Sequence, residues 1–321
     1  MTEIVITAPA RLHLGMLDPA GIGARRYGGF GVGVESPRVV VGVRRRGDED
    51  VVASGAQCDR AAGFAQRARS AFGLEAGVEV TVYEAIAPHV GLGSGTKLGL
   101  AVARGVAALA GISAGPEQLA DASGRGARSS VGAWTFAAPG LVVEAGVAAR
   151  GSISPLLTRY PMPQRWRCVL AVPGGGEGLS GDAEERFFGQ MRESRAAEPR
   201  VARLLLTALL PGLVTGDIEE FGAALTEIQR EVGSMFAAQQ GGVFHPRAAA
   251  LVDALLELGV VAVGQSSWGP SVYGIVDGAD RAADVAARLR ASAGAGAEVS
   301  ALDFDRRGAW LARGGSEQAA A

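Results

Sequence analysis

Alternation between apolar and polar residues dominates the first half of the chain and predicts β-strands. The alternating runs occupy residues 4–7, 9–15, 39–44, 78–86 and 141–144. In the second run, a period of two places Arg11 and His13 on one face of the strand and Leu12 and Leu14 on the other. Apolar residues at helical spacing predict helices at 60–72, 98–110, 116–123 and 133–137.

In the second half, predicted strands alternate with helices that carry one apolar face. The helices are expected at 182–195, 199–213, 217–236, 246–258 and 279–292. The strands are expected at 167–172, 260–265, 272–276 and 297–302. Three prolines mark 153–163 as a junction, so we expect domains at 1–160 and 161–312 and a disordered tail at 313–321. The glycine-rich residues 173–181 are expected to form a mobile loop that closes over ligands.

The segment His89-Val-Gly-Leu-Gly-Ser-Gly-Thr-Lys97, here called the glycine loop, carries the strongest chemical signal. Its glycines allow backbone N–H groups to converge at the start of a helix, whose positive end attracts anions. Hydroxyl groups and one lysine add donors, so we expect a phosphate or pyrophosphate site formed by Gly91, Gly93, Ser94, Gly95, Thr96 and Lys97. The alternative is a glycine-rich turn with a serine or threonine cap. The spacing fits neither the Walker loop nor the dinucleotide fingerprint.

Other polar residues cluster in three further segments. Candidate ligands for a second anion or a substrate are Arg11, His13, Arg26, Arg128, Ser129, Ser130, Ser266, Ser267 and Trp268. A guanidinium matches a phosphate or a carboxylate bidentately, and an indole can stack on an aromatic ring. The alternatives are salt bridges for the arginines, a structural role for His13 and a buried position for Trp268.

Composition narrows the class of protein. The 321 residues are 48% hydrophobic and 20% charged, which is typical of a globular protein. A net charge of −2 argues against bulk nucleic-acid binding. Two cysteines, no apparent signal peptide and no membrane-length apolar run favour a cytoplasmic protein. The three histidines lack metal-ligand spacing, so we expect no protein-built metal site.

Three motifs in order resemble the GHMP superfamily of small-molecule kinases: residues 9–15, 88–95 and 264–274. The resemblance covers nearly the whole chain. It implies an α+β fold with an N-terminal ribosomal-protein-like β-α-β domain, a C-terminal ferredoxin-like domain, and ligand between them.

Two departures argue against kinase activity. In the kinases a second serine follows G-L-G-S and helps to hold magnesium, whereas this chain has Gly95. The kinase S-G-x-D element supplies an aspartate, whereas residues 128–134 offer no carboxylate. Phosphoryl transfer depends on the metal and on a group that positions the nucleophile, so the loss of both argues against a kinase. A true kinase of this superfamily and a non-catalytic ligand-binding relative remain the alternatives.

Four segments together resemble one branch of the superfamily, the β-ribofuranosylaminobenzene 5′-phosphate synthases: R-L-H-L-G, H-V-G-L-G-S-G-T, G-x-R-S-S-V-G and G-Q-S-S-W-G-P. The resemblance implies that 5-phosphoribosyl 1-diphosphate condenses with 4-aminobenzoate, with loss of CO2 and pyrophosphate, on the route to methanopterin-type carriers. It also implies a homodimer.

For that reaction we expect the glycine loop, including Lys97, to bind the pyrophosphate. We expect Mg²⁺ to bind to the diphosphate of the donor, because the sequence shows no cluster of carboxylates that could form a magnesium site of its own. Arg11, Arg26 and Arg128 are expected to bind the 5-phosphate or the benzoate carboxylate, and Trp268 to stack on the ring. His13 is expected to contact the arylamine or the ribose.

Overall fold

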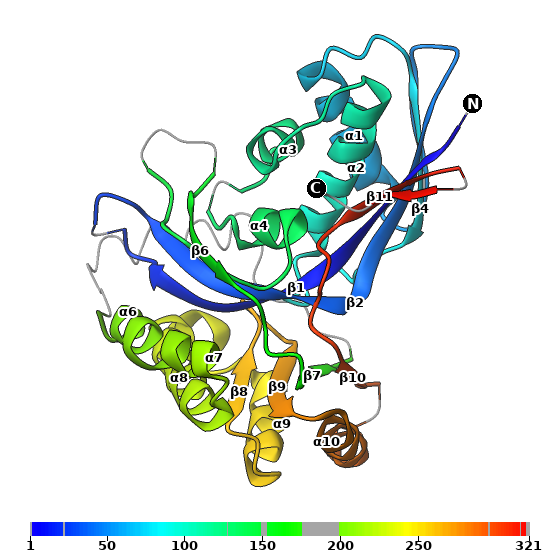
Figure 1. Cartoon of the computed structure of the whole chain (residues 1–321). Coiled ribbons are helices and arrows are strands. Elements are labelled where there is room, and N and C mark those ends of the chain that lie inside the picture. Colours follow the sequence, from blue (N-terminus) through cyan, green and yellow to red (C-terminus); the bar gives the residue numbers. More distant parts are fainter. Residues whose placement is uncertain are drawn as a thin grey trace.

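The chain folds around two β-sheets with helices packed on them (Figure 1). The computed structural model describes residues 2–21, 23–126, 128–148, 153–174, 199–294, 296–314 and 316–318. The first sheet contains β1 Ile4–Asp18, β2 Tyr27–Arg45, β3 Val51–Gly55, β4 Val78–Glu84, β5 Leu141–Glu144, β6 Leu156–Tyr160, β11 Trp310–Arg313 and β12 Ser316–Gln318. The second contains β7 Trp166–Val172, β8 Ala262–Gln265, β9 Val272–Asp277 and β10 Glu298–Leu302, in the order β10-β7-β9-β8.

Helices divide between the two sheets. Those of the first part are α1 Cys58–Ala71, α2 Ser94–Leu109, α3 Pro116–Ser123 and α4 Val131–Ala137. Those of the second are α6 Pro199–Leu204, a π-helical turn Leu205–Leu209, α7 Leu210–Thr215, α8 Ile218–Gln240, α9 Pro246–Glu257 and α10 Ala279–Ser292. The α+β architecture expected from the sequence is confirmed.

The long strand β1 lies between both groups of helices (Figure 1). Helices α2 and α4 contact it from one side, and α6 and α8 contact it from the second part of the chain. Because both faces are covered, nearly every β1 side chain from Ile4 to Met16 is buried. One continuous apolar core therefore runs from the first sheet through α8 to the second sheet, whose other face packs on α9 and α10.

Several predicted elements differ from the structure at their ends. The runs at 4–7 and 9–15 are one strand, since β1 continues through register shifts at Pro9/Ala10 and His13/Gly15. The expected helix at 199–213 contains the π-helical turn before α7. Pro211 has no N–H to donate to the carbonyl four residues earlier, so the α-helical ladder cannot continue there.

The C-terminal segment returns to the first sheet. Strand β11 pairs with β1, and β12 pairs with β11, although the sequence placed 161–312 in one domain and expected a disordered tail after it. Strands β3 and β6 were also not predicted, β6 because it lies in the proline-marked junction. The expected helix at 182–195 and most of the glycine-rich loop at 173–181 lie outside the described residues. No helix within the described ranges has the length and apolarity to cross a membrane.

Candidate active site

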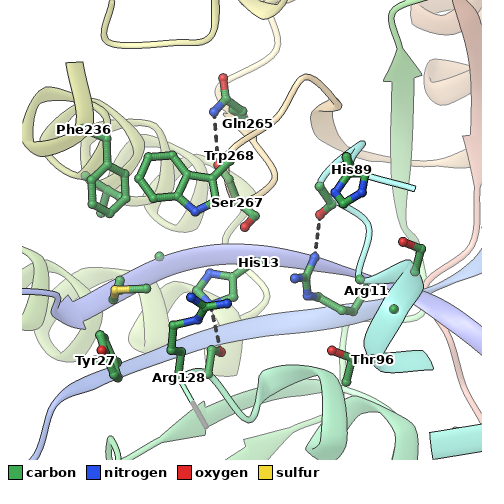
Figure 2. A pocket seen from close by; sticks show the side chains of 18 of the residues that line it. Arg11, His13, Tyr27, His89, Thr96, Arg128, Phe236, Gln265, Ser267 and Trp268 are labelled. Atoms are coloured by element: carbon green, nitrogen blue, oxygen red, sulfur yellow. Dashed lines mark hydrogen bonds between the residues drawn. The ribbon is translucent and has the colours of Figure 1, made fainter. Parts of the chain in front are cut away.

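A cleft of about 850 Å³ lies where the two parts of the chain meet. Strand β1, the N-terminus of α2 and residues 124–126 and 128–129 line one side. Helix α8 and the loop after β8 line the other. Figure 2 shows side chains from both sides pointing into this space, including His13, Thr96 and Arg128 from the first part and Phe236 and Trp268 from the second. The resemblance implied a ligand between the two domains, and the cleft lies at that junction.

The glycine loop forms one wall of the cleft. Helix α2 begins at Ser94, four residues earlier than expected, so the loop's hydroxyl residues lie in the first helical turn. Gly91 and Gly93 have φ of +84° and +79°, a conformation that favours glycine. The loop is held by its carbonyl at Gly91, which accepts hydrogen bonds from the Arg11 guanidinium and, at 2.7 Å, from the Ser266 hydroxyl. The helix N-terminus therefore faces the cleft with its backbone donors oriented toward it.

Two arginines that the sequence analysis did not single out as ligands flank this helix N-terminus. Arg60, from α1, lies so close to Gly95 that a Cβ on residue 95 would be 2.3 Å from its Nη2. Arg125 donates to the Thr96 hydroxyl at 3.4 Å. With Arg11, Arg26 and Arg128 they give five arginines, and the described lining contains no aspartate or glutamate. Such a surface attracts a ligand with several negative charges.

The opposite end of the cleft is aromatic and apolar. Phe236 of α8 and Trp268 have ring centroids 4.6 Å apart, and Met16 completes this small core cluster. Gln265 fixes the Trp268 loop, because its side chain accepts from the backbone N–H of His245 at 2.7 Å. It also donates to the Ser267 carbonyl at 3.1 Å (Figure 2). This end is suited to a flat, uncharged ring face.

Between the two ends, His13 belongs to a buried hydrogen-bonded chain. Its Nε2 lies 3.0 Å from the Ser129 hydroxyl, which donates to a Glu144 carboxylate oxygen at 2.8 Å. Burial, with a smaller effect of Arg11, lowers the pKa of His13 to about 3. Burial raises the pKa of Glu144 to about 7, against the effect of its hydrogen bonds.

Three predicted ligands do not line the cleft. Lys97 is completely buried, and its Nζ donates to the Thr135 hydroxyl at 3.0 Å. Burial lowers its pKa to about 7. At the fourth position of α2 its side chain points into the core rather than toward the loop, so its expected contact with pyrophosphate is wrong.

Ser130 and Ser266 have structural positions instead. The Ser130 hydroxyl donates to the Gly126 carbonyl, and its backbone N–H donates to Glu144 at 2.7 Å. Ser266 links the backbone N–H of His13 to the glycine loop. The other predicted residues line the cleft: Arg11, His13, Arg26, Gly91, Gly93, Ser94, Gly95, Thr96, Arg128, Ser129, Ser267 and Trp268.

Several residues of the cleft and its surroundings were not predicted from the sequence, and four of them bear on its chemistry. Arg60 and Arg125 lie outside the motifs, and Phe236 lies at the end of a helix predicted only from its apolar face. Glu144 ends the buried strand β5, and an acid at the end of an apolar run is the one signal that could have drawn attention to it. It supplies a carboxylate next to Ser129, in the region where the motif itself has none.

Comparison with known proteins places this geometry in context. Residues 59–136 match the N-terminal domain of GHMP kinases, and residues 209–295 match the GHMP kinases C-terminal model. The chain is 31% identical to the β-ribofuranosylphenol 5′-phosphate synthase of Methanothermobacter thermautotrophicus, over 86% of this chain and 89% of that protein. It is also 31% identical to the synthase of the same name from Archaeoglobus fulgidus, over 85% and 87%. Among solved structures, a homoserine kinase from Cytophaga hutchinsonii is similar in fold, with a TM-score of 0.72, 16% identity and 97% of each chain covered.

Proposed function

The chain belongs to the β-ribofuranosylphenol 5′-phosphate synthase family within the GHMP kinase superfamily, and from this premise we propose its reaction. It joins carbon 1 of 5-phosphoribosyl 1-diphosphate to a ring carbon of a 4-substituted benzoate, releasing pyrophosphate and CO2. One observation carries the proposal: a single cleft has an arginine-rich end beside a helix N-terminus and an aromatic end on α8. The first suits a phosphorylated donor and the second a flat acceptor.

The donor's diphosphate is assigned to the N-terminus of α2. Departure of pyrophosphate from carbon 1 leaves an electron-deficient ribose, and the leaving group gains negative charge as the bond breaks. Backbone N–H groups at Ser94 and Gly95, with the Arg60 guanidinium, are fixed in position before the reaction and stabilise this charge. Arg26 and Arg128, on the same side of the cleft, are the candidates for the 5-phosphate.

The acceptor ring is assigned to the aromatic end. Stacking against Trp268 would hold its face toward carbon 1 of the ribose, so that the ring carbon bearing the carboxylate attacks. Loss of CO2 then restores aromaticity. Electron donation from the substituent para to that carbon drives the attack.

The sequence motifs and the names of the relatives point to different para substituents on the acceptor ring. The motifs suggested an aminobenzene product, whereas both relatives are named for a phenol. The two acceptors differ in one ring substituent. We therefore take 4-hydroxybenzoate as the first acceptor to test and 4-aminobenzoate as the second.

Magnesium is assigned to the diphosphate of the donor rather than to a site built from protein side chains. The described residues contain no group of three or more metal-binding side chains, and magnesium prefers phosphate oxygens and waters where a protein supplies few carboxylates. Mg²⁺ bound to the diphosphate would neutralise charge on the leaving group.

The proposal is tested with acceptor labelled at its carboxyl carbon, incubated with purified protein, Mg²⁺ and the phosphoribosyl donor. Labelled CO2 released only when the donor is present supports the synthase. A parallel reaction replaces the donor with ATP. ATP consumption with a metabolite alcohol, without release of CO2, would indicate a kinase. Phosphoryl transfer to an alcohol does not remove the carboxyl group of the labelled acceptor.

A further inference from the structure

Three side chains from separate segments connect the cleft to a carboxylate in the protein interior. His13 of β1 lines the cleft, and its Nε2 is 3.0 Å from the Ser129 Oγ. Ser129 is 2.8 Å from Oε1 of Glu144, the completely buried last residue of β5. Gly29, opposite Glu144 on β2, leaves room for the imidazole, since a Cβ there would be 3.2 Å from the His13 Cε1.

When Glu144 is ionised, its two oxygens can only accept hydrogen bonds, and this fixes the direction of the chain. The Ser130 N–H donates to Oε2 at 2.7 Å, and the Ser129 hydroxyl donates to Oε1. A serine hydroxyl carries one hydrogen, so the Ser129 oxygen accepts the Nε2–H of His13. Nδ1 of His13 is then unprotonated. It has no hydrogen-bond partner among the described residues, and His13 lines the cleft.

The surrounding charges favour a proton on Glu144 over one on the imidazole. Arg11 is on the same strand as His13, and both Arg11 and Arg128 line the cleft beside it. Burial and the positive charge of Arg11 oppose an imidazolium by lowering the pKa of His13. Glu144 faces Gly29 on β2 and Leu156 on β6, neither of which is charged, and its burial favours the protonated carboxyl.

We propose that His13, Ser129 and Glu144 form a proton relay that takes the proton of the acceptor's para-hydroxyl group during ring attack and returns it after CO2 leaves. The inference rests on the proposed function and adds the group that activates the acceptor. His13 is the catalytic residue, because it touches the substrate. Ser129 and Glu144 are positioning residues that act through it.

The relay balances over one turnover. The phenolic proton moves to Nδ1 of His13, the Nε2 proton moves to Ser129, and the Ser129 hydroxyl hydrogen moves to Oε1 of Glu144. The electron pair of the phenolic O–H bond flows into the ring, which forms the bond to ribose carbon 1 as the carbon–oxygen bond to pyrophosphate breaks. The resulting dienone loses CO2, whose bonding pair restores the aromatic ring and leaves a phenolate. Reversal of the three proton shifts converts the phenolate to the phenol product.

The test compares acceptors that differ in how readily the hydroxyl ionises. With 4-hydroxybenzoate, Ser129→Ala and Glu144→Gln are each expected to lower kcat by about 100-fold, the usual contribution of a general base, with KM for the donor unchanged. With 3,5-difluoro-4-hydroxybenzoate, which binds already ionised at neutral pH, the loss in kcat is expected to be less than about fivefold. Raising the pH should rescue the variants on 4-hydroxybenzoate for the same reason.

Ser123→Ala is the matched control, because Ser123 is a buried serine whose hydroxyl donates only to the Ala120 carbonyl within α3. It should leave kcat unchanged with both acceptors. Equal losses with both acceptors in Ser129→Ala and Glu144→Gln would show a structural role and overturn the relay. Unchanged kcat on 4-hydroxybenzoate would also overturn it. If the wild-type protein released CO2 from 4-aminobenzoate but from neither phenol, the relay would be overturned while the proposed function stood. Release of CO2 from none of the three acceptors would overturn both.

Discussion

At the scale of single residues, the cleft differs from a kinase site by substitutions that change its charge. The resemblance to the kinases implies that Gly95 stands where they have a magnesium-binding serine, and the structure shows what occupies that space. The Arg60 guanidinium lies against Gly95, so a fixed positive charge stands beside the helix N-terminus. This exchange suits a site that stabilises a departing diphosphate.

Gly95→Ser is therefore expected to weaken binding of the phosphoribosyl donor. The new side chain would displace Arg60, whose Nη2 lies 2.3 Å from the position that a Cβ on residue 95 would take, and one charge-assisted contact is worth about 1.5–3 kcal/mol. We expect KM for the donor to rise by at least about tenfold, as in Arg60→Met. Steady-state kinetics with varied donor would measure this, and an unchanged KM in both variants would remove Arg60 from the site.

For Lys97→Met, in contrast, we expect no effect on binding of the phosphoribosyl donor. Because Lys97 is buried against Thr135 and lies outside the cleft, the variant should keep KM for the donor within about twofold of wild type. Thermal unfolding would check that the variant is folded. A tenfold rise in KM for the donor in a folded variant would show that Lys97 contributes to the phosphate site.

At the scale of elements, the sequence predicted local patterns well and long-range pairing poorly. The helix at 116–123 and the strand at 141–144 are confirmed to the residue. In contrast, β11 owes its place to pairing with β1, almost the full chain length away, and no local pattern encodes that partner. Arg60 was missed for the same reason, since only the packing of α1 on α2 brings it to the glycine loop.

The aromatic end depends on the contact between α8 and the loop after β8. Trp268→Leu keeps an apolar side chain in the Phe236 cluster but removes the indole surface. We expect KM for the acceptor to rise about tenfold, equivalent to about 1.4 kcal/mol, with KM for the donor unchanged. A change confined to the donor would place the acceptor elsewhere.

At the scale of the whole molecule, a cleft between two packed parts requires polar groups in the shared interior, and these make stability depend on pH. Glu144 is the clearest case. Its pKa in the folded protein is raised to about 7 from an ordinary value of 4.5, so folding favours its protonated form. Its contribution to stability is complete below about pH 4.5 and is lost as the pH rises through about 7.

Relative to Glu144→Gln, the free energy of unfolding of the wild-type protein should therefore fall by about 3 kcal/mol between pH 4.5 and pH 7. The glutamine variant carries no titrating group at this position, so the difference isolates Glu144. Denaturant unfolding at several pH values would measure it. Parallel curves for the two proteins would show that Glu144 titrates normally.

The most direct measurement of the central claim is the bond that the protein makes. The donor would carry ¹³C at ribose carbon 1, and 4-hydroxybenzoate would carry ¹³C at the ring carbon that bears the carboxylate. The account predicts a product whose two labelled carbons show one-bond carbon–carbon coupling by nuclear magnetic resonance. A product without that coupling, in which the ribose carbon is bonded to oxygen, would contradict it.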